Sequence, residues 1–384
     1  MKILVVSNVQ TYPITSGSAK FISDYCSLLK SMGHDVYFLH VTYCALTKIG
    51  RVKIEESSLT TCEKWGDHYF RYQMTVWDKL KEILTSFYHK YVTDCYAGCD
   101  NRYAGGLHHY VEKLNRIYHF DACLVNYYWL TKLLTKVKIP RRGIITHDSF
   151  TFNNLRNNVT SLLNLTPSEE AKALQRCPTI FAMQDEEAIL FKRLAPKSKV
   201  LVSYCNYEYV KQPIIGNHNL LFLSGGFYLN VNGLKWFVEN VFPSILDVFP
   251  DCRLKIGGAI CDFVEKCGYV GGVDLIGYVD SPADFYALGD VAINPTYQGT
   301  GLKIKTFEAM AYDKVTMVHP HSINGIFDKD KAPIFSSDQP SEWLAFLRKI
   351  WGDHSNISVI KRENHNYISR MNDFIKSQFE EFLK

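Results

Sequence analysis

The chain has 384 residues, which exceeds the length over which one hydrophobic core keeps growing, so we expect two domains. Apolar residues make up 47% and charged residues 21%, a globular composition that excludes an intrinsically disordered protein. The formal net charge is only +4, and this mild charge does not indicate nucleic acid as a partner, because dedicated nucleic-acid binders carry a strongly basic face.

The N-terminus and the cysteines favour a cytoplasmic protein. The apolar run at residues 3–6 is shorter than the roughly 7–15 apolar residues of a signal peptide, and no segment approaches the roughly 18 apolar residues of a membrane span. The nearest couples among the cysteines, Cys95 with Cys99 and Cys261 with Cys267, lack the spacing of zinc ligands. We therefore expect reduced cysteines in the cytoplasm.

The first 41 residues predict the start of a parallel sheet. Residues 3–6 form a short apolar run, typical of a strand buried on both faces, and a polar loop follows at 8–18. Apolar residues recur at helical spacing over 21–32, Gly33 ends that helix, and 36–41 predicts the next strand. Strand, helix and strand in this order form a right-handed βαβ unit, the opening of a doubly wound sheet.

Less regular sequence follows, rich in Tyr, Lys and His, over residues 45–120, with an amphipathic stretch around 76–84. Apolar runs then predict further strands of this first sheet at 122–126, 143–146, 179–183 and 200–202. The segment 206–219, which contains proline and glycine, is the expected linker.

The second half repeats one pattern, in which an apolar run ends in glycine or proline and a helix follows. The expected strands are 220–223, 253–256, 273–276, 291–294 and 315–318, and from about residue 356 the chain reads as one or two polar helices. This pattern predicts a second parallel α/β sheet.

Small residues mark the expected ligand edge of the second sheet. In open parallel sheets, ligands bind beyond the carboxyl ends of the strands, and glycine lets a ligand approach the backbone closely. Such ends fall at Gly225 and Gly226, at Gly258, and at Tyr278 and Val279. Each glycine alone is better explained by ordinary turn chemistry, so their alignment at several strand ends carries the inference.

The sharpest local signal follows the strand at 291–294. Gly299 and Gly301 precede a helix whose first N–H groups and positive dipole end suit a phosphate. Lys303 and Lys305 lie near its first turn, where the dipole disfavours cations unless an anion is bound. Lys305 and Glu308 share a helix face and could hold a diphosphate and a ribose. The alternative is a solvated Lys–Glu pair worth only ~0.2–0.5 kcal/mol.

The run Gly-Leu-Lys-Ile-Lys-Thr-Phe-Glu-Ala-Met-Ala at 301–311, followed by the strand at 315–318, resembles the donor-site signature of GT-B glycosyltransferases, specifically the retaining family 4 type. Residues 223–237 and 287–295 resemble the flanking strands and helix of that family. The resemblance implies an α/β protein with two Rossmann-like doubly wound parallel-sheet domains facing a central cleft. We expect an acceptor domain at 1–205, a donor domain at 206–355, and C-terminal helices at 356–384 that pack back toward the N-terminal domain.

This resemblance implies an activity and a set of partners. Sugar would pass from a nucleotide diphosphate sugar to an acceptor hydroxyl with retention of configuration, in the synthesis of a surface polysaccharide such as O-antigen or capsule. The protein would supply cations and a helix N-terminus around the leaving diphosphate, without a strong nucleophile, an essential metal or a cofactor. The expected partners are the nucleotide sugar and a glycan or lipid-linked acceptor.

The resemblance also implies roles for individual residues. The expected catalytic residues are Lys305, Lys303, Glu308 and His147; the donor site would comprise Gly225, Gly226, Gly258, Tyr278, Val279, Thr300, Gly301 and Leu302; and the acceptor or cleft would be contacted by Gly17, Asn126 and Asp148.

The chain departs from the family at two places in the donor site. Thr300 stands where many members carry the first Glu of an E-x7-E pair that ends at Glu308, so its contact with the sugar would come from a hydroxyl. The segment 225–234 contains no Arg or Lys, which leaves the diphosphate charge to Lys303 and Lys305.

Residues of the first half have alternatives that stay open at this point. His147 follows the strand at 143–146 and could bond the sugar or the acceptor, or serve as a structural histidine. Asn126 stands where some relatives carry a histidine. The loop 15–18 could contact a ligand through its backbone, or it could be an ordinary turn with Ser18 as the helix N-cap.

The aromatic and basic stretch at 65–120 suits contact with anionic lipid at the inner face of the plasma membrane, although a packed helix with solvated charges gives the same pattern. The residues concerned are Trp77, Lys79, Lys81, Phe87, Tyr88, His89, Lys90, Tyr91 and Arg102.

Other functions fit parts of the sequence. Sugar-nucleotide epimerases and phosphorylases share the two-domain shape but not the spacing at 301–311, and a non-catalytic nucleotide-sugar-binding protein would fit the departure at Thr300. A dinucleotide oxidoreductase is disfavoured because neither half has G-x-G-x-x-G after its first strand.

Overall fold

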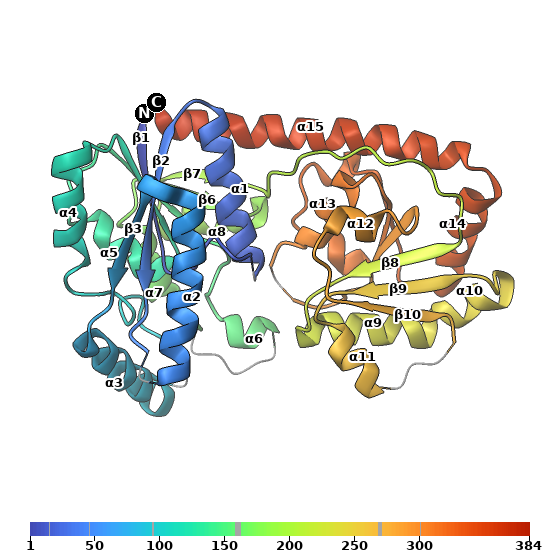
Figure 1. Cartoon of the computed structure of the whole chain (residues 1–384), viewed down its shortest axis with the longest axis horizontal. Helices are drawn as coiled ribbons and strands as arrows, with labels where there is room; N and C mark the ends of the chain where they lie inside the picture. Colours follow the sequence, from blue (N-terminus) through green and yellow to red (C-terminus); the bar gives the residue numbers. More distant parts are fainter. Residues whose placement is uncertain (15, 46, 94–95, 158–162, 268–270, 300) are drawn as a thin grey trace. The chain divides into compact units, whose positions relative to one another are not determined.

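The computed structural model describes the chain apart from residues 15, 46, 94–95, 158–162, 268–270 and 300. Its described residues form two compact units (Figure 1): unit 1 comprises Met1–Asn206 with Phe374–Lys384, and unit 2 comprises Tyr207–Asp373. The sequence set 356–384 apart as one C-terminal segment. In the structure one helix, α15 (Ser355–Leu383), contributes residues to both units.

Unit 1 is a seven-stranded sheet in the order β3-β2-β1-β4-β5-β6-β7, with every pair parallel. The strands are β1 (Lys2–Ser7), β2 (Asp35–Thr42), β3 (Tyr69–Gln73), β4 (Ala122–Asn126), β5 (Arg141–Ile145), β6 (Thr179–Ala182) and β7 (Lys199–Val202). Its helices are α1 (Gly17–Ser31), α2 (Lys48–Trp65), α3 (Val76–Val92), α4 (Leu107–Tyr118), α5 (Thr131–Leu134), α6 (Asn153–Asn157), α7 (Pro167–Leu174) and α8 (Asp185–Leu194), with short 3-10 helices η1 (Gly66–His68) and η2 (Tyr128–Leu130). The strand order reverses between β1 and β4, which makes their carboxyl ends the expected ligand edge.

The predicted N-cap of α1 is wrong. Ser16 is the cap, and its hydroxyl accepts a hydrogen bond from the backbone N–H of Ala19 at 3.2 Å. Ser18 Oγ instead accepts a hydrogen bond from the Tyr127 hydroxyl at 2.6 Å. The helix therefore starts one residue after Ser16, at Gly17, and Ser18 joins it to the end of β4.

Unit 2 is a six-stranded parallel sheet in the order β10-β9-β8-β11-β12-β13. The strands are β8 (Asn219–Leu223), β9 (Arg253–Gly257), β10 (Val273–Gly277), β11 (Val291–Asn294), β12 (Val315–Val318) and β13 (Ile334–Ser336). The helices are α9 (Tyr228–Asn240), α10 (Phe242–Val248), α11 (Cys261–Cys267), α12 (Pro282–Tyr286), α13 (Ile304–Ala311) and α14 (Pro340–Gly352), with η3 (Pro320–Ile323), η4 (Lys329–Lys331) and most of α15. Here the order reverses between β8 and β11.

Close packing fixes α9 against the loop that follows β11. A Cβ atom added at Gly233 would lie 2.8 Å from the Cα of Thr296, so a larger residue at this position of α9 would push the helix away. The core beneath contains fully buried rings of Phe222, Phe237 and Trp343. This packing brings the start of α9, the end of β8 and the β11 loop to one edge of the sheet.

The predicted linker is anchored to unit 2. Lys361 of α15 donates hydrogen bonds to the carbonyls of Gln212 and Pro213, and its amine lies 3.6 Å from the buried carboxylate of Asp290. Asp290 in turn accepts hydrogen bonds from the backbone of Ile215 and Gly216. The segment between β7 and β8 is therefore held by buried charges.

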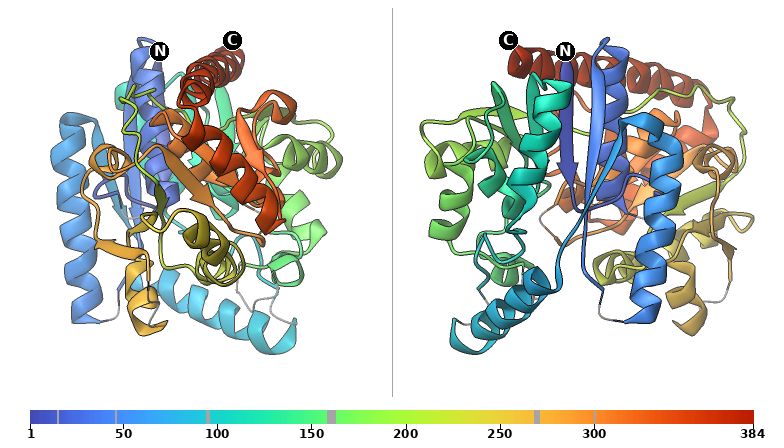
Figure 2. Two further views of the ribbon diagram at one scale, coloured as in Figure 1. Left: turned by 90° about the vertical axis from the view of Figure 1, so that its right-hand side faces the viewer. Right: turned by 60° about the vertical axis from the view of Figure 1, so that its left-hand side comes forward.

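Both termini lie at one end of unit 1, and α3 lies at the opposite end of that unit (Figures 1 and 2). Phe379, near the end of α15, is fully buried in unit 1 and stacks on Phe181 with ring centroids 4.8 Å apart. Over the residues that the structure describes, no helix is both long and apolar enough to cross a bilayer.

Candidate functional site

Lys305 is the centre of the candidate site in unit 2. It is the second residue of α13, and its Nζ donates hydrogen bonds to Ser224 Oγ at 3.2 Å and to Asn230 Oδ1. The amine also lies 5.3 Å from the ring centre of Phe222, above the ring face. One amine thus joins the end of β8, the first turn of α9 and the first turn of α13.

The electrostatic state of Lys305 is unusual. Burial and, to a smaller extent, the neighbouring positive charge of Lys303 lower its pKa to about 7, although the negative charge of Glu308 acts in the opposite direction. A large part of the Lys305 population is therefore uncharged near neutral pH. An anion placed beside the amine would favour the charged form, so the position suits a phosphate better than it suits an isolated cation.

Lys303 folds back on the loop before the helix. It is the N-cap residue of α13, and its Nζ donates to the carbonyls of Gly299 at 3.1 Å and Gly301 at 3.0 Å. The carbonyl of Gly299 also accepts a hydrogen bond from His321 Nε2 at 2.6 Å. Gly299 has φ +95°, a conformation that favours glycine. The two lysines therefore have different hydrogen-bond partners.

Glu308 lies one turn further along α13. Its Oε2 accepts a hydrogen bond from the Tyr286 hydroxyl at 3.4 Å, and its negative charge acts on Lys305. Lys305 and Glu308 are thus near neighbours on one helix, each with its own hydrogen-bond partners.

The predicted glycines lie at the carboxyl ends of β8 and β9. The Gly225 carbonyl accepts a hydrogen bond from Asn230 Nδ2 at 3.1 Å, and a Cβ atom at Gly226 would lie 2.4 Å from the Phe263 ring. Gly258 has φ +91°, and a Cβ atom there would lie 2.4 Å from the Ser224 carbonyl oxygen. These close contacts hold the backbone of the two strand ends together beside Lys305.

The remaining predicted donor residues divide by exposure. The Tyr278 side chain is 83% exposed, whereas Val279 packs against a small apolar cluster that includes Phe285. Gly301 and Leu302 are half-buried in the loop before α13. Thr300 lies outside the described residues.

Ser224, Asn230, Tyr286 and His321 also belong to this site, although the sequence assigned them no role. Ser224 and His321 follow β8 and β12, so the rule that ligands bind beyond strand ends could have found them. Asn230 and Tyr286 contact the lysine and the glutamate through tertiary packing, which no local pattern reveals.

In unit 1 the structure brings His147 and Asn126 together at the ends of β5 and β4. Asn126 Nδ2 donates to the Val6 carbonyl at 3.2 Å, which fixes its Oδ1 as the acceptor of the 2.8 Å bond from His147 Nε2. Burial lowers the pKa of His147 to about 3, so the ring is neutral and its Nδ1 is a potential acceptor. The ring stacks on Tyr127 with centroids 4.2 Å apart.

Asp148 and Gly17 each have a structural role within unit 1. Asp148 Oδ1 accepts a hydrogen bond from the Ser149 backbone, and burial raises its pKa to about 6 while its neighbour Glu187 is raised to about 8. The two carboxyl groups therefore share a proton near neutral pH. Gly17 is the first residue of α1, directly after its N-cap.

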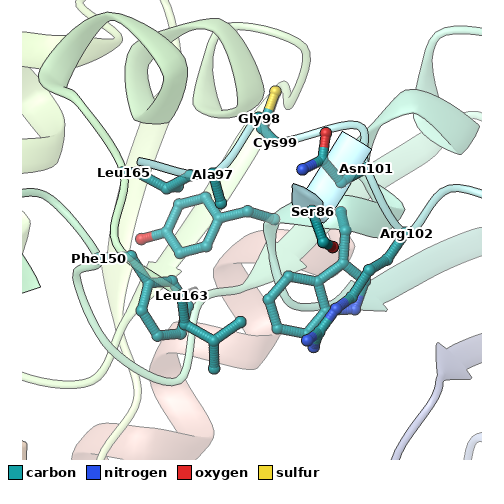
Figure 3. A pocket seen from close by; sticks show the side chains of 11 residues that line it. Ser86, Ala97, Gly98, Cys99, Asn101, Arg102, Phe150, Leu163 and Leu165 are labelled. Atoms are coloured by element: carbon teal, nitrogen blue, oxygen red, sulfur yellow. The ribbon is translucent and has the colours of Figure 1, made fainter. Parts of the chain in front are cut away.

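Unit 1 also contains a pocket beside the end of β4, which encloses about 420 Å³ counting space open to solvent. Figure 3 shows apolar side chains, including Phe150 and Leu163, on one side and the polar side chains of Asn101 and Arg102 on the other. The pocket is lined by Ser86, Ala97, Gly98, Cys99, Asn101, Arg102, Tyr128, Trp129, Phe150, Leu163 and Leu165.

Across the described parts of both units, no group of three or more His, Cys, Asp or Glu side chains could hold a metal ion. Of the cysteine couples considered as zinc ligands, Cys95 and the side chain of Cys267 lie outside the described part of the chain.

Residues 218–353, all within unit 2, match the family described as Glycosyl transferases group 1. A Klebsiella pneumoniae protein described as an uncharacterized 44.6 kDa protein in the cps region is 31% identical over 104 residues, which cover 24% of this chain and 27% of that protein. The chain thus matches about a quarter of the length of this curated relative.

Solved structures resemble the whole chain. TarM has a TM-score of 0.68 at 9% identity, covering 100% of this chain and 98% of its own. Anabaena Alr3699/HepE in complex with UDP has a TM-score of 0.61 at 13% identity, with 100% and 99% covered. The pneumococcal O-GlcNAc transferase GtfA in complex with UDP and GlcNAc has a TM-score of 0.62 at 8% identity, with 100% and 99% covered.

The predicted fold class is confirmed, because both units have doubly wound parallel sheets and the solved relatives share the whole architecture. The predicted resemblance to GT-B glycosyltransferases is supported for unit 2, where residues 218–353 match the group 1 glycosyl transferases, and the solved structures of TarM and GtfA share the fold of the whole chain.

Proposed function

We propose that unit 2 binds a nucleotide diphosphate sugar with its diphosphate beside Lys305, and that the protein transfers the sugar to an acceptor hydroxyl. The observation that carries this proposal is the Lys305 amine, bonded to Ser224 and Asn230 at the start of α13 and held at a pKa of about 7 by burial and Lys303. A bound diphosphate would stabilise both lysine charges and would lie at the positive end of the α13 dipole.

The proposed transfer proceeds with retention of configuration. The bond between the sugar and the diphosphate breaks, a bond to the acceptor oxygen forms on the same face, and the acceptor proton passes to the leaving diphosphate. Lys305 and Lys303 would stabilise the growing negative charge, with Lys303 exchanging the Gly299 and Gly301 carbonyls for phosphate oxygens. Glu308 would accept hydrogen bonds from ribose hydroxyls. We propose no metal or cofactor, because these two cations supply the positive charge.

We further propose that unit 1 binds the acceptor, a glycan or a lipid-linked glycan of a surface polysaccharide, on the cytoplasmic side of the membrane. The aromatic rings of Tyr128, Trp129 and Phe150 in the unit 1 pocket offer flat apolar surfaces, and Arg102 offers a cation. The partial likeness to a protein of a cps region supports a role in capsule synthesis, and the UDP complexes among the solved relatives support UDP as the first nucleotide to test.

In a thermal-shift comparison, we expect UDP-, GDP-, ADP- and CMP-linked sugars to differ in how much they raise the Tm. A donor present at about 100 times its Kd stabilises the native state by about 2.7 kcal/mol and raises the Tm with concentration. CMP-linked sugars are the matched control, because they lack a diphosphate. No rise in Tm with any diphosphate sugar would contradict the proposed donor site.

The nucleotide sugar that raises the Tm can then be used as a substrate to distinguish a glycosyltransferase from an epimerase or a non-catalytic binding protein. A glycosyltransferase would hydrolyse the donor slowly without acceptor and transfer its sugar once a polysaccharide acceptor is added. Conversion of the donor to another sugar nucleotide without acceptor would indicate an epimerase. Binding without turnover across acceptors would indicate a non-catalytic protein.

The affinity for nucleoside diphosphate is expected to fall as pH rises through 7. Lys305 attracts the diphosphate only when protonated, and its pKa without ligand is about 7. Above that value, Kd should rise by up to about tenfold per pH unit until the pKa of the complex is reached. Calorimetric titrations one unit below and one unit above pH 7 measure this. A Lys305→Arg variant, whose charge is permanent, is the control and should lose the pH dependence.

The free energy of unfolding of the ligand-free protein should rise with pH, whereas the affinity for nucleoside diphosphate falls. The lowered pKa means that the unfolded state binds more protons than the native state between pH 7 and the ordinary lysine value of 10.5, so the contribution of Lys305 to stability rises with pH over that window. A Kd for nucleoside diphosphate that does not change with pH would contradict the proposed contact between Lys305 and the diphosphate.

A further inference from the structure

Helix α3 packs with its polar side toward the protein and its apolar side toward solvent. The inner stripe includes Asp78, Glu82 and His89, and among the described side chains of the helix only Glu82 is buried. The outer stripe is exposed, with Trp77 at 80% and Phe87 at 65%. The exposed apolar residues are Val76, Trp77, Leu80, Ile83, Leu84, Phe87, Tyr88, Tyr91 and Val92. A helix on the surface of a water-soluble domain normally has the opposite arrangement.

Polar contacts hold the helix in this orientation. Glu82 pairs with Lys79 at 2.9 Å and with Arg102 at 3.2 Å. Asp78 accepts a hydrogen bond from the Gly105 backbone at 2.9 Å and closes a capping box with Thr75. Turning the apolar stripe inward would break these contacts and expose two paired carboxylates. The outward apolar face is therefore a built feature of unit 1.

The charges of the outer face indicate what covers it. Lys81 and Lys90 are exposed on α3, whereas both acidic residues of the helix face inward, so none of its exposed side chains is acidic. Tryptophan and tyrosine, represented by Trp77, Tyr88 and Tyr91, suit the boundary between lipid headgroups and acyl chains. Apolar rings flanked by lysines complement an anionic membrane surface, where each lysine adds about fivefold in affinity.

The position of α3 agrees with this partner. The helix lies at the end of unit 1 opposite the chain termini, and α2 begins at the same end (Figures 1 and 2). The first turns of α2 expose Ile49 and Val52 at this end of the unit. We propose that the outer face of α3 lies in the headgroup region of an anionic bilayer, parallel to the membrane plane, and seats unit 1 on it. This inference does not depend on the donor site in unit 2.

Flotation with vesicles tests the proposal. The full chain is mixed with vesicles of phosphatidylcholine alone or of phosphatidylcholine and phosphatidylglycerol in equal parts, and the vesicle-bound fraction is measured. We expect binding to the mixed vesicles. Combined Trp77→Ser and Phe87→Ser substitutions should lower the affinity for the mixed vesicles by about a hundredfold, because burying each aromatic side chain raises the affinity more than tenfold. Combined Lys81→Gln and Lys90→Gln substitutions should lower it by roughly 25-fold on anionic vesicles only.

The control is Ile117→Ser on α4, because Ile117 is an apolar side chain of unit 1 with 60% exposure outside the α3 face. It should bind vesicles like the unchanged protein, and all the variants should keep their Tm because the replaced side chains are exposed. Equal binding of the α3 variants and the Ile117 variant would overturn the proposal. So would the absence of vesicle binding together with a dimer in solution that the Trp77 and Phe87 substitutions dissociate, because the face would then bind a second copy of the chain.

Discussion

Replacing Lys305 with methionine or alanine is expected to lower the kcat/KM of sugar transfer by about 10²–10³-fold, the usual cost of removing one preorganised group that stabilises developing charge. The methionine variant keeps an apolar chain above Phe222 while removing the amine that bonds Ser224 and Asn230. The measurement is initial rates with the donor found by thermal shift, together with the Kd for its nucleoside diphosphate. The kcat/KM should fall and the Kd should rise.

Lys235→Ala is the matched control. Lys235 lies on α9 in the same unit, and its side chain is 60% exposed and 3.8 Å from Glu239, so its removal should leave both rates and Kd unchanged. The Tm of the Lys305→Met variant should not fall, because the native state no longer desolvates an amine. A correctly folded Lys305→Met protein with wild-type kcat/KM would show that the diphosphate binds elsewhere.

Gly258→Ala is expected to destabilise the protein by about 2–4 kcal/mol, the sum of backbone strain and overpacking. Gly258 has φ +91°, and the new methyl group would lie 2.4 Å from the Ser224 carbonyl oxygen. The ends of β8 and β9 must separate to accept it, and Ser224 would move away from Lys305. Donor affinity should therefore fall together with the midpoint of urea unfolding.

Gly225→Ala distinguishes this clash from a general effect of losing glycine at the site. No heavy atom lies within 4 Å of the added Cβ at Gly225, and its φ lies outside the left-handed region. Its stability should change by less than about 0.5 kcal/mol. Equal unfolding midpoints for the two variants would show that the backbone at Gly258 adapts without cost.

The buried strands were predictable because both sheet faces are covered. Strands β1, β4 and β11 contain continuous apolar runs at 3–6, 122–125 and 291–293, and that pattern indicates a parallel sheet. Strand β3, with the sequence YFRYQ, and the three-residue β13 were missed. Both are half-buried edge strands, so neither shows an apolar run or strict alternation.

The candidate site was predictable only in part, because some of its contacts depend on tertiary structure and not on local sequence. Glycines and lysines near strand ends follow from local sequence, whereas the contact of Lys305 with Ser224 depends on β8 and β11 being neighbours in the sheet. In α3 the spacing revealed two faces, but periodicity does not say which face is turned inward. The partners of Glu82, above all Arg102 in the segment between α3 and α4, decide that question.

The division of α15 between the units affects the order of synthesis and folding. The chain leaves unit 1 at Asn206 and returns to it only at Phe374, yet Phe379 fills a fully buried place against Phe181. A nascent chain emerging from the ribosome therefore exposes that part of the first sheet while all of unit 2 is being made. All residues of unit 2 are synthesised before the last residues of unit 1, so the second unit can complete its core first although the first unit begins to be translated earlier.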